Sequence, residues 1–166
     1  MRTEAQIVGN LLEYEDDRLV ASVGHEAKVW STRTWDLMTC FKGHTKPITG
    51  LDVCPESFSA DERSRDEGAE RYGGARLLTC SDDQTVKVWD LLTGVCLLTY
   101  RAHGEDVNAV LSLPNRCVAS CADDASVHIW DMDSGHTLLE LNGHTHYVCY
   151  HTPLTTLDFP ISHRSK

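Results

Sequence analysis

The chain contains one short phrase three times: Lys28-Val29-Trp30-Ser31, then Val86-Lys87-Val88-Trp89-Asp90, then Val127-His128-Ile129-Trp130-Asp131. Each tryptophan is followed fourteen positions later by a histidine, which gives the pairs Trp30 and His44, Trp89 and His103, and Trp130 and His144. The steps between successive tryptophans are 59 and 41 residues. The shorter step fits a repeat unit of about 40–45 residues, and the longer step is that unit plus an insertion of 18.

The repeated phrase has the pattern of a β-strand with one buried face. Thr85–Trp89 and Ser126–Trp130 alternate and are rich in β-branched residues, and each follows an Asp-Asp pair that can form a tight turn. The sequence therefore predicts hairpins, repeated along the chain.

These spacings resemble the WD40 repeat family over residues 6–148. The resemblance implies an all-β fold of tandem four-stranded antiparallel blades packed around a central channel, here an incomplete β-propeller. The expected blades cover about 6–41, 48–100 and 107–141, with the start of a fourth beyond them. Their expected strands are 6–12, 18–23, 27–31 and 37–41, then 48–53, 76–81, 85–90 and 95–100, then 107–113, 117–121, 126–131 and 136–141.

The same resemblance implies a hydrogen-bonded brace in each blade, made of a histidine, a hydroxyl, an aspartate and the tryptophan. Two complete sets match the pattern: His44, Thr79, Asp83 and Trp89, and His103, Ser120, Asp124 and Trp130. The first unit has Val20 and Gly24 at the hydroxyl and aspartate positions, so we expect no brace there. Because a buried indole N–H and a buried carboxylate each need a partner, loss of Asp83 or Asp124 should destabilise the fold.

Three blades fall short of the four to eight of a closed propeller, so the outer faces of the first and third blades should lack neighbours. His144 has no following hydroxyl, aspartate and tryptophan to join. We therefore expect a slice of a longer propeller, completed by further blades of a parent chain or by another copy. Residues 54–75 are expected to form a charged loop insertion, either a regulated contact or a solvated excursion, and residues 149–166 an irregular tail.

Composition narrows the class of function. Fifteen Lys and Arg against twenty-five Asp and Glu give a formal charge of −10, which disfavours nucleic acid and anionic lipid as partners. No apolar stretch approaches the ~20 residues of a spanning helix, so no membrane insertion is expected. Seven cysteines without a C-x-x-C pair, and no secretion signal, favour reduced thiols and a cytoplasmic location. Four of them, Cys80, Cys96, Cys117 and Cys121, fall in strand positions and are expected in the core.

No catalytic constellation is present: the chain has no Gly-rich phosphate loop, no Gly-x-Ser-x-Gly and no His-Glu-x-x-His. We expect neither an enzyme nor a cofactor. A metal site is the alternative at the carboxy-terminal end, where His144, His146, Cys149 and His151 fall within eight residues. Alternation along a strand would divide these four between two faces, which disfavours a shared ion, and the expectation is no metal.

The resemblance implies a scaffold or adaptor that binds proteins or peptides. Positions beside the brace residues would form a contact rim; they are Lys46, Asp82, Glu105, Asp106, Asp123 and His146. This rim is mostly acidic, which favours a basic partner, although ordinary solvated charge is the alternative. Two other functions stay open: a regulatory carboxy-terminal piece of a larger signalling or membrane-traffic enzyme, and a ubiquitin-ligase substrate receptor, for which Trp30-Ser31-Thr32-Arg33 is an imperfect Trp-Asp-x-Arg match.

Overall fold

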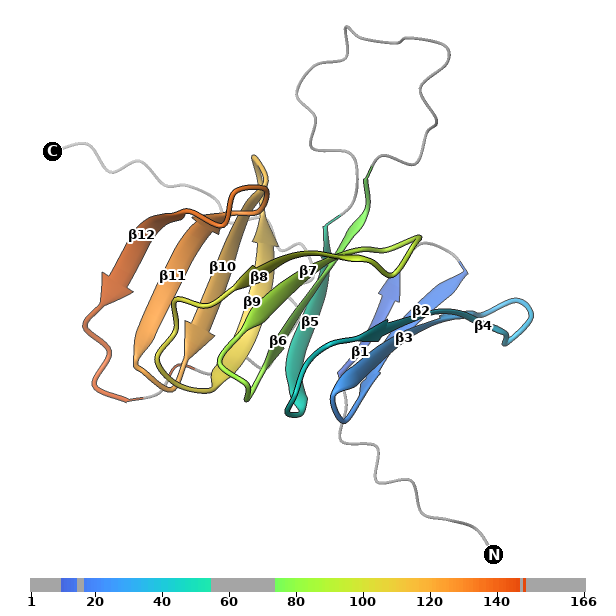
Figure 1. Ribbon diagram of the computed structural model, residues 1–166, viewed down its shortest axis with the longest axis horizontal. Coiled ribbons are helices and arrows are strands. Elements are labelled where there is room, and N and C mark those ends of the chain that lie inside the picture. The colour runs from blue at the N-terminus through green and yellow to red at the C-terminus, as the bar shows by residue number, and fades with distance from the viewer. Residues whose placement is uncertain (1–9, 15–16, 55–73, 147, 149–166) are drawn as a thin grey trace, which may run out of the picture.

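The computed structural model describes residues 10–14, 17–54, 74–146 and 148, and within these residues it is built from strands and turns (Figure 1). The strands form three four-stranded antiparallel sheets, in the orders β1-β2-β3-β4, β5-β6-β7-β8 and β9-β10-β11-β12. Each sheet is one blade, and the three stand side by side (Figure 1). The expected all-β incomplete propeller is confirmed.

The first blade consists of β1 (Leu11–Tyr14), β2 (Arg18–Val23), β3 (Glu26–Ser31) and β4 (Leu37–Lys42). The second consists of β5 (Ile48–Cys54), β6 (Arg76–Ser81), β7 (Val86–Asp90) and β8 (Cys96–Tyr100). The third consists of β9 (Val107–Leu113), β10 (Cys117–Ala122), β11 (Ser126–Asp131) and β12 (Thr137–Asn142).

Strand ends lie within one residue of the expected ones except at β1. This strand begins at Leu11 and ends at Tyr14, whereas the sequence pattern placed it at 6–12. Its register explains the shift, since Leu12 pairs with Val20 and Tyr14 with Arg18 across the first hairpin. Residues 55–73 of the expected insertion and residues 149–166 of the expected tail lie outside the described residues.

The apolar core lies between the blades. One cluster joins the first blade to the second, and includes Val20, Val29 and Phe41 against Leu77 and Trp89. The other cluster joins the second blade to the third, with Leu78, Val88 and Tyr100 facing Val118, Trp130 and Met132. Each blade junction is therefore a sheet-on-sheet contact that removes apolar side chains from water.

In the second and third blades, the aspartate that follows the repeated tryptophan shapes the next turn. Asp90 Oδ1 accepts hydrogen bonds from the backbone N–H of Thr93 at 2.8 Å and from its hydroxyl at 2.7 Å. Asp131 does the same with Ser134, at 2.8 Å and 2.6 Å. Such local acceptors favour tight turns, which accounts for the Trp-Asp dipeptide as a local device. No described helix is long and apolar enough to cross a membrane.

Candidate functional site

The second blade contains one continuous hydrogen-bonded chain. Trp89 Nε1 donates to Thr79 Oγ1 at 2.9 Å, and Thr79 Oγ1 lies 2.7 Å from His44 Nε2. The other ring nitrogen of His44, Nδ1, is 2.8 Å from Asp83 Oδ2. The four side chains predicted for this brace are thus brought together, from the loop before β5, from β6, from the turn after it and from β7.

The geometry assigns the protons along this chain. Thr79 Oγ1 accepts from the indole, so its own hydrogen goes to His44 Nε2, and His44 Nδ1–H donates to the Asp83 carboxylate. This arrangement needs a neutral imidazole. Burial is the largest influence on the pKa of His44 and lowers it, and the neighbouring Asp83 only partly offsets that effect.

The third blade repeats the arrangement. Trp130 Nε1 donates to Ser120 Oγ at 3.2 Å, and His103 lies 2.8 Å from Ser120 Oγ through Nε2 and 3.0 Å from Asp124 Oδ2 through Nδ1. Burial lowers the pKa of His103 as it does for His44. Serine replaces threonine without changing the path of the hydrogen bonds.

Each brace aspartate accepts hydrogen bonds from several donors besides its histidine. Asp124 also accepts from the backbone N–H groups of Gly104 and Ser126, each at 3.0 Å, and from the Ser126 hydroxyl. Burial alone would raise the pKa of this carboxyl, but these bonds outweigh it and lower the pKa of Asp124 to about 2. The pKa of Asp83 is lowered in the same way, with Thr45 and Thr85 as donors.

Sequence reasoning missed the second hydroxyl of each brace. Thr85 Oγ1 lies 2.6 Å from Asp83 Oδ1, and Ser126 Oγ lies 2.5 Å from Asp124 Oδ1. Both residues stand four positions before their tryptophan, so the repeat spacing carried this signal. Their hydroxyls hold the aspartate carboxylate against the turn.

The first blade has no such brace, and the length of the turn between β2 and β3 explains why. Its hairpin has two residues between Val23 and Glu26, which pair directly, whereas three stand between Ser81 and Thr85 in the second blade. The shorter turn shifts the register, so Ala21, and not Val20, lies opposite Lys28 where Thr79 lies opposite Lys87. The first blade has no aspartate in this turn, and the methyl group of Ala21 takes the place of the brace hydroxyl. It therefore cannot form the hydrogen-bonded chain.

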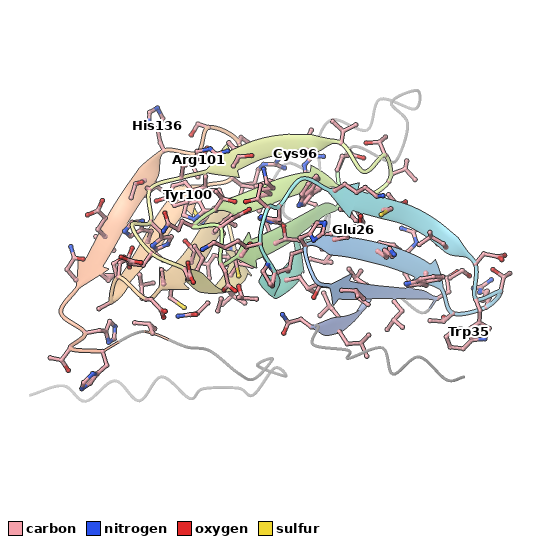
Figure 2. The ribbon with its side chains drawn as sticks, turned by 60° about the horizontal axis from the view of Figure 1, so that its bottom comes forward. Glu26, Trp35, Cys96, Tyr100, Arg101 and His136 are labelled. Atoms are coloured by element: carbon pink, nitrogen blue, oxygen red, sulfur yellow. The ribbon has the colours of Figure 1, made fainter. Side chains whose placement is uncertain are left out.

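A further network, absent from the sequence prediction, joins the second blade to the third. Tyr100 lies between these blades (Figure 2), and its ring stacks on Trp130 with centroids 4.4 Å apart. Its hydroxyl lies 2.9 Å from His128 Nδ1 and 2.8 Å from Thr137 Oγ1. The His128 ring stacks in turn on His103 at 4.0 Å. The second blade has Lys87 at the position of His128, so this network belongs to one junction.

A partly buried acceptor, Asp52, strengthens the same junction near the inner strands. Asp52 Oδ2, on β5, accepts from the backbone N–H and the hydroxyl of Ser112, on β9, both at 2.7 Å. At the inner ends of the blades the Thr49 hydroxyl donates to Val107 O, and the Asn108 amide donates to Val148 O at 3.1 Å. Side chains of the innermost strands thus link successive blades.

All six predicted rim residues lie at one end of the array. They occupy the turns after β6 and β10 (Asp82, Asp123) and the segments after β4, β8 and β12 (Lys46, Glu105, Asp106, His146). Because the strands are antiparallel, these segments meet at the end opposite Cys54 and Arg33. The structure thus gathers the predicted residues on one side of the array, and what they bind stays a prediction.

Negative charge dominates the rim. The pKa of Asp82 is raised, first by burial and then by the neighbouring carboxylate of Asp106, with Lys46 acting in the opposite direction. Lys46 Nζ lies 3.4 Å from Asp106 Oδ1, in an exposed pair that screening weakens. Asp123 accepts from the Asn108 side-chain amide at 2.7 Å. The four rim carboxylates therefore outnumber the single rim lysine, Lys46.

The predicted core cysteines divide between buried and exposed positions. Cys80 is fully buried, and burial raises the pKa of its thiol to about 12, so it is an inert apolar filler. Cys121 is buried as well, but Cys117 is only partly buried and Cys96 is exposed, so the expectation of a core position was wrong for these two. Cys96 is the first residue of the outer strand β8 and lies on the outside of the blade (Figure 2).

The described residues hold no group of three or more His, Cys, Asp or Glu side chains that could bind a metal ion. His144 and His146 are exposed at the end of the third blade. Cys149 and His151, the other members of the alternative metal set, lie outside the described residues.

A family comparison agrees with this geometry. The model for "WD domain, G-beta repeat" matches residues 35–90 and 94–131, which is more than half of the chain. The chain belongs to the WD40 family. In WD40 propellers as a class the fold supplies an interaction surface, and any specific activity depends on the residues of the site.

Curated WD40 relatives match only part of the chain. The Denticleless protein homolog of Homo sapiens is 30% identical over 90 residues, 53% of this chain and 10% of that protein. A probable E3 ubiquitin ligase complex SCF subunit, sconB, of Arthroderma otae is 50% identical over 38 residues, 23% of this chain and 6% of that protein. The chain spans less than a fifth of the length of the curated relatives it matches.

Two solved structures share the fold. The computationally designed Ika8 protein superposes with a TM-score of 0.66 and 26% identity, over 84% of this chain and 38% of that one. The WD40 β-propeller domain of Doa1 superposes with a TM-score of 0.63 and 21% identity, over 82% of this chain and 40% of that one. Three blades therefore correspond to well under half of either chain.

Proposed function

We propose that this WD40 chain is a protein-interaction adaptor whose acidic rim binds a basic peptide segment. The observation that carries the proposal is the gathering of Asp82, Glu105, Asp106 and Asp123 at one end of a rigid blade array. Two braces fix the turns that present these residues, so the carboxylates are held in place before a partner arrives. Charge of one sign on one surface steers an opposite charge and aligns it.

Burial and mutual repulsion at the rim support a binding role over idle surface charge. Burial, and after it the carboxylate of Asp106, raises the pKa of Asp82, and the second cause means that the two negative charges oppose each other. A lysine- or arginine-rich segment would relieve that repulsion by placing cations between the carboxylates. Loops on a rigid scaffold commonly carry recognition in this way.

Fluorescence anisotropy with a fluorescein-labelled Lys/Arg-rich peptide tests the proposal. We expect binding that weakens as salt is added, and at least a several-fold loss of affinity in the double variant Glu105→Gln/Asp123→Asn. The control, Asp36→Asn/Asp133→Asn, removes the same charge from exposed positions at the opposite end. An equal loss in both double variants, or binding that is insensitive to both, would contradict a rim site.

A second candidate function is substrate recognition in a ubiquitin ligase, and the similarity to the probable SCF subunit sconB favours it. Arg33, the arginine of the Trp-Asp-x-Arg-like stretch, lies in the β3–β4 turn with Nε 3.3 Å from Asp17 and its side chain 75% exposed. Ubiquitination of a basic-peptide fusion by a purified SCF-type ligase, with and without this chain, tests the role. Loss of the stimulation in Arg33→Ala would support it, and stimulation that is absent altogether would exclude it.

A further inference from the structure

The outer face of the third blade lacks the cover that the first two blades have. Phe41, Tyr100 and Leu141 each stand eleven positions after their blade's tryptophan. Phe41 meets Trp89 of the next blade edge-on at 5.8 Å, and Tyr100 stacks on Trp130. Their exposed fractions are 1% and 4%, whereas that of Leu141 is 46%.

Neighbouring positions on β11 and β12 are likewise less covered than their equivalents in the second blade. Val86 and Val88 of the second blade are buried against the third, while their equivalents Val127 and Ile129 are partly exposed. Leu139 pairs with Ile129 and is 51% exposed. We call these four residues, Val127, Ile129, Leu139 and Leu141, the β12 face. It contains no charged side chain.

The space around the glycines that follow β4 and β12 shows the same difference. A Cβ placed on Gly43 would lie 3.1 Å from the Trp89 ring, so the chain passes close to the next blade there. Gly143 occupies the same place after β12, and a Cβ on it would meet nothing within 4 Å. The third blade is thus shaped for a tryptophan-bearing sheet that the described residues do not supply.

The first blade presents such a sheet, on the side of the middle blade opposite the third blade (Figure 1). Trp89 and Trp130 are 2% and 0% exposed because the preceding blade covers them, whereas Trp30 is partly exposed. Leu37 pairs with Trp30 and is 48% exposed, and Leu19 pairs with it on the other side. We call Leu19, Lys28, Trp30 and Leu37 the Trp30 face.

A lysine on the Trp30 face does not prevent a covered junction. Lys87, at the position of Lys28, is 8% exposed in the junction between the first and second blades. Its Nζ donates to Thr99 at 2.9 Å and lies 5.9 Å from the Trp89 ring, so its charge has partners while its stem packs. Lys28 has Glu26 at 3.7 Å as a partner already.

We propose that the β12 face binds the Trp30 face of a second copy of this chain. The junctions inside the molecule indicate this partner. The second blade packs on the first, and the third packs on the second. The same arrangement, repeated once more, places the first blade of a second copy on β12. The contact is heterologous, since each copy contributes a different face to it. Two copies supply six blades, a number within the four to eight of closed propellers.

This contact lacks one element of the internal junctions. His144 would lie opposite Ala21 and the Gly24–His25 turn, where the positions of the brace hydroxyl and the brace aspartate hold alanine and glycine. The association therefore rests on apolar contact and should be weaker than the junctions between blades of one chain, with dissociation on dilution. It does not depend on the acidic rim, so the rim variant Glu105→Gln/Asp123→Asn should associate normally.

Sedimentation velocity of the full chain over a wide concentration range tests the proposal. Leu141→Asp and Leu37→Asp each place a charge on one of the two faces at an exposed site, so folding should persist, as circular dichroism would verify. Leu92→Asp is the matched control, because Leu92 is 55% exposed in the β7–β8 turn of the middle blade. We expect the parent and the control to associate into dimers or larger species, and each face variant to sediment as a monomer.

Mixing the two face variants distinguishes this contact from a symmetric one. Leu141→Asp keeps an intact Trp30 face and Leu37→Asp an intact β12 face, so an equimolar mixture should recover a dimer that neither forms alone. A monomeric parent at all concentrations, a Leu37→Asp variant that dimerises like the parent, or a mixture that stays monomeric would each overturn the proposal.

Discussion

At the scale of single residues, the protein depends on pairs of groups that satisfy each other out of contact with water. His44 and His103 are neutral donors to ionised aspartates, and one hydroxyl in each brace passes a hydrogen bond from the indole to the imidazole. A partly satisfied network of this kind costs more than an apolar core, because every stranded polar group keeps its desolvation penalty.

We expect Asp124→Ala to destabilise the protein by about 3 kcal/mol, because it removes an ionised acceptor and strands buried donors on His103 and Ser126. Urea denaturation followed by tryptophan fluorescence measures the free energy of unfolding. The exposed Asp36→Ala is the control and should change it by less than about 0.5 kcal/mol. Similar unfolding curves for the two variants would contradict the structural role of the brace.

At the scale of elements, the turns do more than reverse the chain. The β7–β8 turn of the second blade reaches the outer strand of the first, and a Cβ on Gly94 would lie 3.0 Å from Thr39 Cγ2 and 3.3 Å from Cys40 O. Gly94 also has φ +74°, a region that favours glycine. Gly24 has φ +59° in the first hairpin, but a Cβ there would meet nothing within 4 Å.

These two glycines separate backbone strain from blade contact. Gly24→Ala should cost about 1 kcal/mol of stability through the left-handed conformation alone. Gly94→Ala carries the same strain and in addition pushes β4 away from the turn, so its cost should be larger by about 1–2 kcal/mol. Thermal or urea unfolding of the two variants gives the comparison, and equal costs would show that the turn does not bear on the first blade.

At the scale of the whole molecule, stability is shared among blade junctions that differ in chemistry. The junction of the first and second blades is apolar with a lysine at its edge, while that of the second and third adds the Tyr100, His128 and Thr137 network. The titrating groups of both braces respond to acid in the same direction, because their pKa values are all lowered in the folded state.

Acid should therefore destabilise the whole fold in two stages. The pKa values of His44 and His103 lie below the ordinary 6.5, so their contribution is complete above pH 6.5 and is lost as the pH falls through the folded values. Asp83 and Asp124 contribute above the ordinary 3.8, and that part is lost as the pH falls further, toward about 2 for Asp124. Urea midpoints measured from pH 8 downward should be level at first and then decline; a midpoint that rises between pH 6.5 and 5 would refute the neutral-histidine assignment.

The amino-acid sequence by itself determined the repeat and, apart from β1, the strands, and its resemblance to WD40 repeats supplied the members of the two braces. This was possible because the same offsets separate Trp89 from Asp83 and Thr79, and Trp130 from Asp124 and Ser120, and residues at fixed offsets in a hairpin repeat their pairing. Thr85 and Ser126 followed the same rule and were within reach of that reasoning.

Only the tertiary structure decided how the blades meet. The two-residue turn of the first hairpin moved Ala21 into the hydroxyl position, Cys96 came to the surface, and Tyr100 reached His128 across a junction. The exposed β12 and Trp30 faces likewise became visible only beside their covered equivalents. The physical reason is that periodicity records contacts within a repeat, whereas contacts between repeats depend on register and packing, where one residue more or less in a turn redirects every side chain that follows.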